Sequence, residues 1–205
     1  SRSSAASDVY KRQAQDNAEV RVIVLTGAGE KAFVAGADIK EFADFDRAQG
    51  EDLARRGQRN LFDRVEQSHK PVVAAINGFA LGGGLELAMA AHVRVASTNA
   101  RMGLPEVSLG VIPGYGGTQR LAQIVGKGKA MEMVLTGGMI PADDALKCGL
   151  VNQVVEPELL LETAQILASK MAKNAPTALA AALDSVLAGY NRDGYAVEIE
   201  RFGKC

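Results

Sequence analysis

The apolar positions of this chain fall into two kinds of segment: short runs rich in β-branched residues, and longer stretches with helical spacing. Residues 20–27 (VRVIVLTG) form an apolar run closed by a glycine, which predicts a buried strand. A second apolar run at 70–78 has a proline near its start and ends on an Asn-Gly turn. Residues 92–97 alternate between polar and apolar side chains, and residues 150–155 are again apolar. The pattern predicts a strand in each of these four segments.

The other apolar positions recur at three- and four-residue spacing, which is typical of helices with one buried face. Residues 27–39 are rich in Gly and Ala and are expected to form a loop. A second loop starts at residue 110 and leads into a helix that Gly126 ends. Because strands and helices alternate before helices dominate, the order predicts an α/β fold with a helical C-terminal region. Helices are expected over 44–67, 85–91, 129–137, 141–149, 157–174 and 175–190.

Composition narrows the class of protein. The chain has 205 residues, of which 47% are hydrophobic and 23% charged, with a net charge of −1. This balance argues against nucleic acid as a partner, because a nucleic-acid binder carries a basic excess. No apolar run approaches the ~18 residues that span a membrane, and no signal peptide is visible, so a cytoplasmic protein is expected. Two Cys and two His residues make a metal site unlikely and provide no disulfide framework.

The two ends of the chain suggest a fragment. Residues 1–13 (SRSSAASDVYKRQ) are rich in serine and lack an apolar period, so they are interpreted as a linker or foreign sequence. The C-terminus stops inside a segment with helical character. The expected organisation is a core at 14–156 followed by an incomplete helical region at 157–205.

A glycine triplet stands just before an apolar run in GFALGGGLELA, residues 78–88. Glycines leave the backbone of residues 82–84 bare, and the N–H groups at a helix start can then contact a phosphate or a developing oxyanion. The alternative is that the glycines only allow a helix and a strand to pack closely. Both interpretations remain open on the triplet alone. Neither dinucleotide-binding nor P-loop glycine motifs occur in the chain.

Two glutamates are candidates for proton transfer. Glu86 lies among apolar neighbours on the expected helix, where burial would raise its carboxyl pKa. Glu106 follows Pro105 in a Gly/Pro-containing loop. Two carboxylates in different environments can divide acid and base roles. The alternatives are a partner for the helix dipole (Glu86) and a surface charge (Glu106). His69 and His92 flank predicted strands and are interpreted as polar surface residues.

Four separated segments, in order, resemble the crotonase superfamily and are most similar to enoyl-CoA hydratases: KAFVAGADIKEF, KPVVAAINGFALGGGLELAMAAHVRVAS, RMGLPEVSLGVIPGYGGTQRL and AMEMVLTGGMIPADDALKCGLVNQVV. The resemblance covers roughly residues 20–205. It implies an α/β, crotonase-like ββα spiral with a C-terminal helical region. Members begin with a strand pair and a helix that are missing here, so the first turn of the spiral is expected to be incomplete.

The resemblance also implies a site. Ala37 and Gly83 match the two residues whose backbone N–H groups form an oxyanion hole for a thioester carbonyl. Glu86 and Glu106 stand at the positions of the catalytic glutamates, with Glu86 expected to activate water and Glu106 to protonate the α-carbon. No metal and no cofactor are implied, since coenzyme A arrives as part of the substrate. Residues expected to contact the substrate or its coenzyme A are Ala35, Ala37, Asp38, Ile39, Lys40 and Gly83.

The expected function is hydration of trans-2-enoyl-CoA in fatty-acid oxidation. The resemblance further implies a homotrimer or a dimer of trimers. Gly114, Gly116 and Gly117 are expected to shape the acyl pocket. Alternatives are another acyl-CoA reaction of the superfamily (isomerisation, decarboxylation or thioester hydrolysis), an inactive fragment or scaffold, an RNA-binding relative, and a serine protease of similar architecture. Relatives that run these other acyl-CoA reactions usually lack one of the two glutamates, so the presence of both favours hydration.

Overall fold

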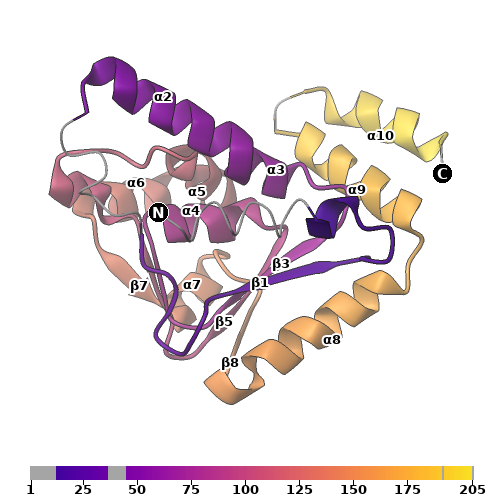
Figure 1. Ribbon diagram of the computed structural model, residues 1–205, viewed down its shortest axis with the longest axis horizontal. Helices are drawn as coiled ribbons and strands as arrows, with labels where there is room; N and C mark the ends of the chain where they lie inside the picture. Colours follow the sequence, from indigo (N-terminus) through magenta and orange to yellow (C-terminus); the bar gives the residue numbers. More distant parts are fainter. Residues whose placement is uncertain (1–12, 37–44, 191, 205) are drawn as a thin grey trace.

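The structure is a computed structural model that describes residues 13–36, 45–190 and 192–204 (Figure 1). Its strands form two four-stranded sheets. The first sheet is parallel throughout, in the order β1 (Ile23–Thr26), β3 (Val72–Ile76), β5 (Val93–Ser97) and β8 (Gln153–Val155). These are the four strands that the apolar runs predict.

The second sheet consists of strands of three residues each, in the order β2 (Ala32–Val34), β4 (Phe79–Leu81), β6 (Arg101–Gly103) and β7 (Met139–Pro141). β2, β4 and β6 are parallel, and β7 runs antiparallel to β6. The sequence pattern did not predict these strands, and β2 lies within the segment expected to be a loop. Three residues are too few to establish a two-residue period.

The two sheets are built together. Each pass of the chain adds one strand to the first sheet, then one to the second, and then a helix: β1–β2, β3–β4 and β5–β6 follow this rule. This is the ββα spiral that the sequence predicts. The helices after the first two passes are α2 (Arg47–Gly57) with its continuation η2 (Gln58–Phe62) and α3 (Asp63–Glu66), and then α4 (Gly83–Ala90).

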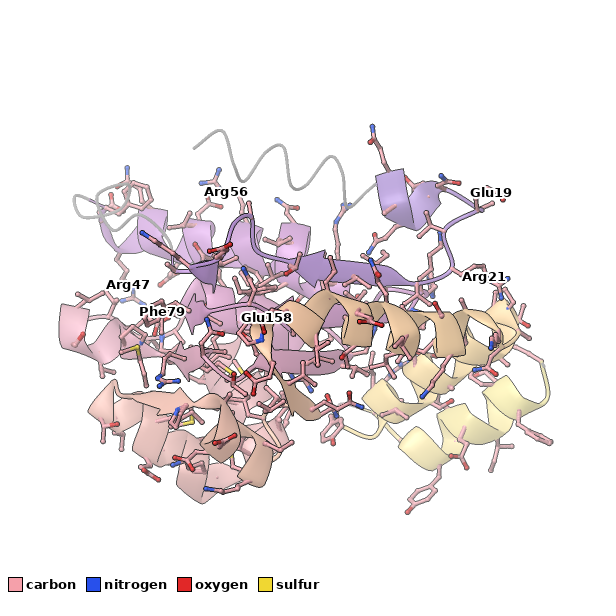
Figure 2. All side chains as sticks on the ribbon, turned by 90° about the horizontal axis from the view of Figure 1, so that it is seen from below. Glu19, Arg21, Arg47, Arg56, Phe79 and Glu158 are labelled. Atoms are coloured by element: carbon pink, nitrogen blue, oxygen red, sulfur yellow. The ribbon has the colours of Figure 1, made fainter. Side chains whose placement is uncertain are left out.

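The helical run from Arg47 to Glu66 matches the predicted segment 44–67. η2 is a π-helical turn in the middle of this run. α2 buries none of its side chains. Figure 2 shows Arg47 and Arg56 of this helix at the surface, where they pair with Glu51 and Asp52. Burial begins only at Phe62 and Val65, so it is the C-terminal part of the run that packs on the core.

Later helices complete the fold. α5 (Gly117–Val125) and α6 (Lys127–Thr136) lie between β6 and β7 in the chain, α7 (Ala142–Lys147) follows β7, and Gly126 ends α5 as expected. The C-terminal region holds α8 (Leu160–Ala172), α9 (Pro176–Ala188) and α10 (Gly194–Phe202), preceded by a short 3-10 turn, η4 (Pro157–Leu159). In Figure 1, α8 runs along one side of the first sheet, and α9 and α10 form a hairpin beside it.

β3 shows how the first sheet is buried on both faces. Val72, Ala74 and Ile76 belong to the main core, which lies against α4 and the second sheet. Val73 and Ala75 face the opposite way and pack with Leu160 and Ala164 of α8. A parallel strand covered on both faces is apolar at every position, which explains the continuous run at 72–76.

The prediction of a buried strand at 20–27 was only partly right. A strand forms at Ile23–Thr26, but its first three residues are half-buried and Thr26 is exposed. β1 is the edge of the first sheet among the described residues and has β3 as its one neighbour there. Arg21, just before β1, donates to the Asn174 carbonyl at 2.7 Å and so ties this edge to the connection between α8 and α9 (Figure 2).

His92 is not the surface residue that was expected, whereas His69 is exposed as predicted. The half-buried His92 accepts a hydrogen bond from the Val72 N–H at Nδ1, 2.9 Å away, and its Nε2 lies 3.0 Å from the Glu66 carbonyl. Burial lowers the pKa of this imidazole. The two bonds require the neutral tautomer with its proton on Nε2.

The alternation at 92–97 also has a different origin from the one expected. The polar member Arg94 does not face solvent, since only 7% of its surface is exposed. Its guanidinium donates to the Leu150 carbonyl at 2.8 Å and to the Ala91 carbonyl, at the C-terminal end of α4, at 2.5 Å. Burial lowers the pKa of Arg94 to about 10, which leaves it charged at neutral pH. A cation at the C-terminal end of α4 interacts favourably with the helix dipole.

We predict that Arg94→Met lowers the free energy of unfolding by ~3 kcal/mol, because the buried carbonyls that Arg94 satisfies lose their donor. Urea titration measures the change. Arg64→Met, at an exposed position of α3, is the matched control and should change stability by less than ~0.5 kcal/mol. Equal effects of the two substitutions would contradict a capping role for Arg94.

Candidate active site

The three glycines of the triplet occupy different environments. Gly82 has φ +53, a conformation that favours glycine, and precedes α4. At Gly84 an added Cβ would lie 1.9 Å from the Val34 carbonyl oxygen, so this glycine lets α4 pack directly on β2. At Gly83 a Cβ would meet nothing closer than the Tyr115 ring at 3.6 Å. The close-packing interpretation therefore holds for Gly84, whereas a Cβ at Gly83 would make only ordinary van der Waals contacts.

Gly83 is the first residue of α4, and its N–H belongs to the first-turn donors that have no acceptor within the helix. Gly83 is also half-buried, between the buried Gly82 and Gly84. A helix start of this kind can bind an anionic oxygen without interference from a side chain.

Glu86 lies on the first turn of α4, with 1% of its surface exposed. Its Oε1 accepts hydrogen bonds from the backbone N–H groups of Tyr115 and Gly117, both at 2.8 Å. Its Oε2 points toward Gly83, where an added Cβ would lie 4.0 Å away. One carboxylate oxygen is thus held by the loop before α5, and the other faces the start of α4.

The loop before α5 is shaped to hold this carboxylate. Gly116 has φ +90 and forms the N-cap of α5. At Gly117 an added Cβ would lie 2.8 Å from Glu86 Oε1. Gly117, which was expected to shape an acyl pocket, therefore makes room for the Glu86 carboxyl, whereas a Cβ at Gly116 would lie 2.3 Å from Arg120 Nη1.

Glu106 is carried by the 3-10 helix η3 (Pro105–Leu109) and is half-buried, so it is not the plain surface charge of the alternative interpretation. Its Oε1 would lie 2.9 Å from a Cβ at Gly82. Its Oε2 is buried and has no hydrogen-bond partner among residues 13–36, 45–190 and 192–204. A buried acceptor without a partner is unusual and suits a bound water or ligand.

Burial raises the pKa of both carboxyl groups. Desolvation is the largest cause for Glu86, whose pKa rises from 4.5 to about 7 against the opposing effect of the two backbone hydrogen bonds. The charge of Glu106 raises it further, so the two carboxylates interact electrostatically. Desolvation also raises the pKa of Glu106. A carboxyl group with its pKa raised to about 7, as for Glu86, can gain and lose a proton near neutral pH.

The remaining site candidates lie at the end of β2. Ala35 follows Val34 directly and is exposed. Ala37, Asp38, Ile39 and Lys40 lie outside the described residues. The structure therefore brings together Gly83, Glu86 and Glu106, while the second proposed oxyanion donor at Ala37 is not described.

A cavity of about 490 Å³ lies elsewhere, between α9 and the C-terminal end of α4. Met89, Ala90, Leu183 and Val186 are among its walls, and neither Glu86 nor Glu106 lines it. Its walls are mainly apolar, so it lacks the pair of adjacent acidic groups found at the glycine triplet. Among the described residues, no cluster of three His, Cys, Asp or Glu side chains could hold a metal ion. No described helix is long and apolar enough to cross a membrane.

The raised pKa of Glu86 predicts a pH-dependent cost to stability. Between pH 4.5 and 7 the folded chain keeps a proton that the unfolded chain releases, so stability falls as pH rises through this range. Glu86→Gln removes this dependence. Between pH 5 and pH 8 we expect the free energy of unfolding of the parent chain to fall by about 2 kcal/mol more than that of Glu86→Gln. Urea titrations at both pH values test this, with the exposed Glu162→Gln as control; parallel pH curves for parent and Glu86→Gln would contradict it.

Comparison with known proteins places these residues in a family. The enoyl-CoA hydratase/isomerase family model matches residues 8–200. The short-chain-enoyl-CoA hydratase of Clostridium acetobutylicum is 48% identical over 194 residues, which cover 93% of this chain and 74% of that protein. The crotonyl-CoA hydratase of Syntrophomonas wolfei is 41% identical over 193 residues, with the same coverage.

Solved structures agree with the sequence relatives. The enoyl-CoA hydratase of Bacillus anthracis superposes with a TM-score of 0.88 at 42% identity, covering 95% of this chain and 76% of that one. The two-sheet spiral and the C-terminal helices are thus those of the crotonase fold. The chain belongs to the enoyl-CoA hydratase/isomerase family of the crotonase superfamily, as its sequence motifs predicted.

Proposed function

We propose that this chain is an enoyl-CoA hydratase that adds water, in the syn sense, across the 2,3 double bond of a trans-2-enoyl-CoA to give a 3-hydroxyacyl-CoA. The observation that carries the proposal is the pair of glutamates beside the glycine start of α4: Glu86 is buried with its Oε2 directed toward Gly83, and Glu106 is half-buried with an Oε2 that has no partner among the described residues. Two relatives with 41–48% identity bear hydratase names, which supports the same reaction.

In the proposed reaction, Glu86 and Glu106 hold one water molecule. Glu86 takes a proton from this water while the water oxygen bonds to the β-carbon of the substrate. Electron density then moves onto the thioester oxygen. The N–H groups of Gly83 and Ala37 stabilise that oxyanion, and each such donor is worth on the order of 10²–10³ in rate. Glu106 then donates its proton to the α-carbon, which completes the addition of H and OH.

This assignment requires the form of the pair in which Glu106 carries the proton and Glu86 is ionised. Glu86, with its pKa raised to about 7, competes for the same proton. The reaction therefore depends on the pair sharing one proton, and after each turnover the proton on Glu86 must return to Glu106.

The substrate's adenosine-bearing end is proposed to lie along Ala35, Ala37, Asp38, Ile39 and Lys40, which follow β2. The C-terminal end of β2 lies beside α4, since Gly84 packs on Val34. A thioester at Gly83 would therefore lie near the C-terminal end of β2. Coenzyme A comes with the substrate, and the proposed chemistry needs no metal. A cytoplasmic location and a role in fatty-acid oxidation are proposed along with the activity.

We predict that Glu86→Gln and Glu106→Gln each lower kcat by about 10³-fold, because each removes one proton-transfer group. Loss of the enoyl absorbance of crotonyl-CoA, run beside a longer enoyl-CoA, measures the rate. In the parent chain kcat/KM should fall below about pH 7, as Glu86 takes up a proton. Glu162→Gln is the surface control. Near-parental turnover in Glu106→Gln would refute the two-carboxylate mechanism, and conversion of a 3-enoyl-CoA without hydration would favour an isomerase.

The division of roles has its own test. A saturated acyl-CoA such as butyryl-CoA cannot add water, but it can exchange an α-proton with D₂O if a carboxylate faces the α-carbon. We expect Glu106→Gln to abolish this exchange and Glu86→Gln to retain it within about tenfold. Proton NMR of the recovered thioester measures the exchange. The reverse pattern would swap the roles of the two residues.

We also propose that the chain assembles as a homotrimer or a dimer of trimers. Large apolar side chains are exposed on α6 and on the loop after η3: Leu135 and Ile112 each expose 70% of their surface. Burial of such side chains against another copy of the chain would stabilise the assembly. Sedimentation of the purified chain tests the assembly, and a monomer at micromolar concentration would contradict it.

A further inference from the structure

The loop that holds Glu86 is itself fastened to the helix beside it. Tyr115 and Gly117 donate their N–H groups to Glu86 Oε1, and the Tyr115 carbonyl has a different partner. That carbonyl accepts a hydrogen bond from Arg120 Nη1 at 2.7 Å. Arg120 lies on α5, and only 8% of its side chain is exposed. One peptide segment therefore lies between the guanidinium of Arg120 and the carboxyl of Glu86.

The rest of the Arg120 guanidinium is held by α3. Nε donates to Glu66 Oε1 at 3.0 Å, and Nη2 donates to Glu66 Oε2 at 2.8 Å, so the two side chains form a fork. Nη2 also lies 3.1 Å from Asp63 Oδ1. A planar guanidinium with this many fixed partners has one orientation, which a lysine ammonium could not reproduce.

The same helical run contacts the loop at two further points. The Phe62 and Tyr115 rings stack with their centroids 4.8 Å apart. Gln58 Nε2 donates to the Gly114 carbonyl at 2.8 Å. Gln58, Phe62 and Glu66 are spaced four residues apart, so one face of the run η2–α3 carries these contacts.

We propose that Arg120, oriented by Glu66 and Asp63, is a positioning residue that acts through the Tyr115 peptide to hold the Glu86 carboxyl in its reactive orientation. Its effect on turnover rests on the proposed function, but its effect on the state of Glu86 does not. A carboxyl must be held within a fraction of an ångström to work as a base, and a shift of about 1 Å can cost about 100-fold in rate.

Charge adds to the geometric effect. Burial is the main cause of the raised pKa of Glu86, the Glu106 carboxylate on η3 adds to it, and the Arg120 guanidinium on α5 opposes it. Glu66 and Asp63 on α3 partly neutralise Arg120. Loss of the Arg120 charge should therefore raise the pKa of Glu86 further.

A purely structural role makes a different prediction. A buried ion cluster that only joins α3 to α5 would affect the melting temperature, and a folded variant that keeps the charge at position 120 would keep the Glu86 chemical shift and the kcat of the parent. Because loss of the Arg120 charge by itself changes the Glu86 titration, the charge-conserving Arg120→Lys separates the two roles.

The experiment follows Glu86 by ¹³C NMR of the chain labelled at glutamate side-chain carboxyls, with the signal assigned by its loss in Glu86→Gln. We expect Arg120→Gln to raise the Glu86 midpoint by about one pH unit. Arg120→Lys, which keeps the charge and loses the fork, should shift the midpoint by less than about half a unit. Glu66→Gln removes the carboxylate that orients the Arg120 guanidinium. We therefore expect the chemical shift of the Glu86 carboxyl to change in this variant.

Kinetics with crotonyl-CoA give the second readout. Arg120→Gln and Arg120→Lys should each lower kcat at least about tenfold while KM changes less than about threefold. Arg201→Gln is the matched control: it breaks an arginine–carboxylate pair with Asp184, between α10 and α9. This control should leave both kcat and the Glu86 midpoint unchanged.

The outcomes are distinct. An unshifted Glu86 signal in folded Arg120→Gln and Glu66→Gln overturns the positioning role, even if the parent is an active hydratase. If the Glu86 signal shifts in these two variants but the parent chain has no hydratase activity, the positioning role stands and the proposed function is wrong. If Arg120→Gln does not fold, Arg120→Lys and Glu66→Gln decide the matter, and parental kcat together with a parental Glu86 signal in both would overturn the proposal.

Discussion

The site depends on one carboxyl group that is kept away from water at the start of a helix. Glu86 is almost fully buried, and the two backbone hydrogen bonds to its Oε1 offset part of the cost of burying its charge. Because they engage only one oxygen, the other remains directed toward Gly83. The same burial that raises the pKa of Glu86 to about 7 makes it a group that can exchange protons at neutral pH.

The fold around Glu86 serves this arrangement from several directions. β2 approaches α4 so closely that only glycine fits at position 84, and the loop before α5 approaches Glu86 so closely that only glycine fits at 117. η3 brings Glu106 to the opposite side of the glycine turn at Gly82. The segments meet because the spiral places β2, β4 and β6 side by side, with α4 following β4 and η3 following β6.

The apolar pattern predicted the first sheet and the main helices, whereas the roles of Glu86 and Glu106 were expected from the family resemblance. A strand covered on both faces is apolar throughout, and amphipathic helices repeat every three to four residues. The second sheet was missed because its strands have three residues each. Arg94, Arg120 and His92 were missed or misjudged for a different reason: their partners are mostly backbone carbonyls or carboxylates 20 to 60 residues away, and no local pattern records such contacts. The number of apolar neighbours around a charged residue was the one available signal, and it identified Glu86 but not Arg94.

Glu86 and Glu106 are proposed to face one space and to hold one water molecule between them. A high-resolution crystal structure of the chain tests this most directly. We predict an ordered water within about 3 Å of Oε2 of both glutamates, beside the Gly83 N–H. Two carboxyl groups that open into separate cavities, each with its own solvent, would contradict the account.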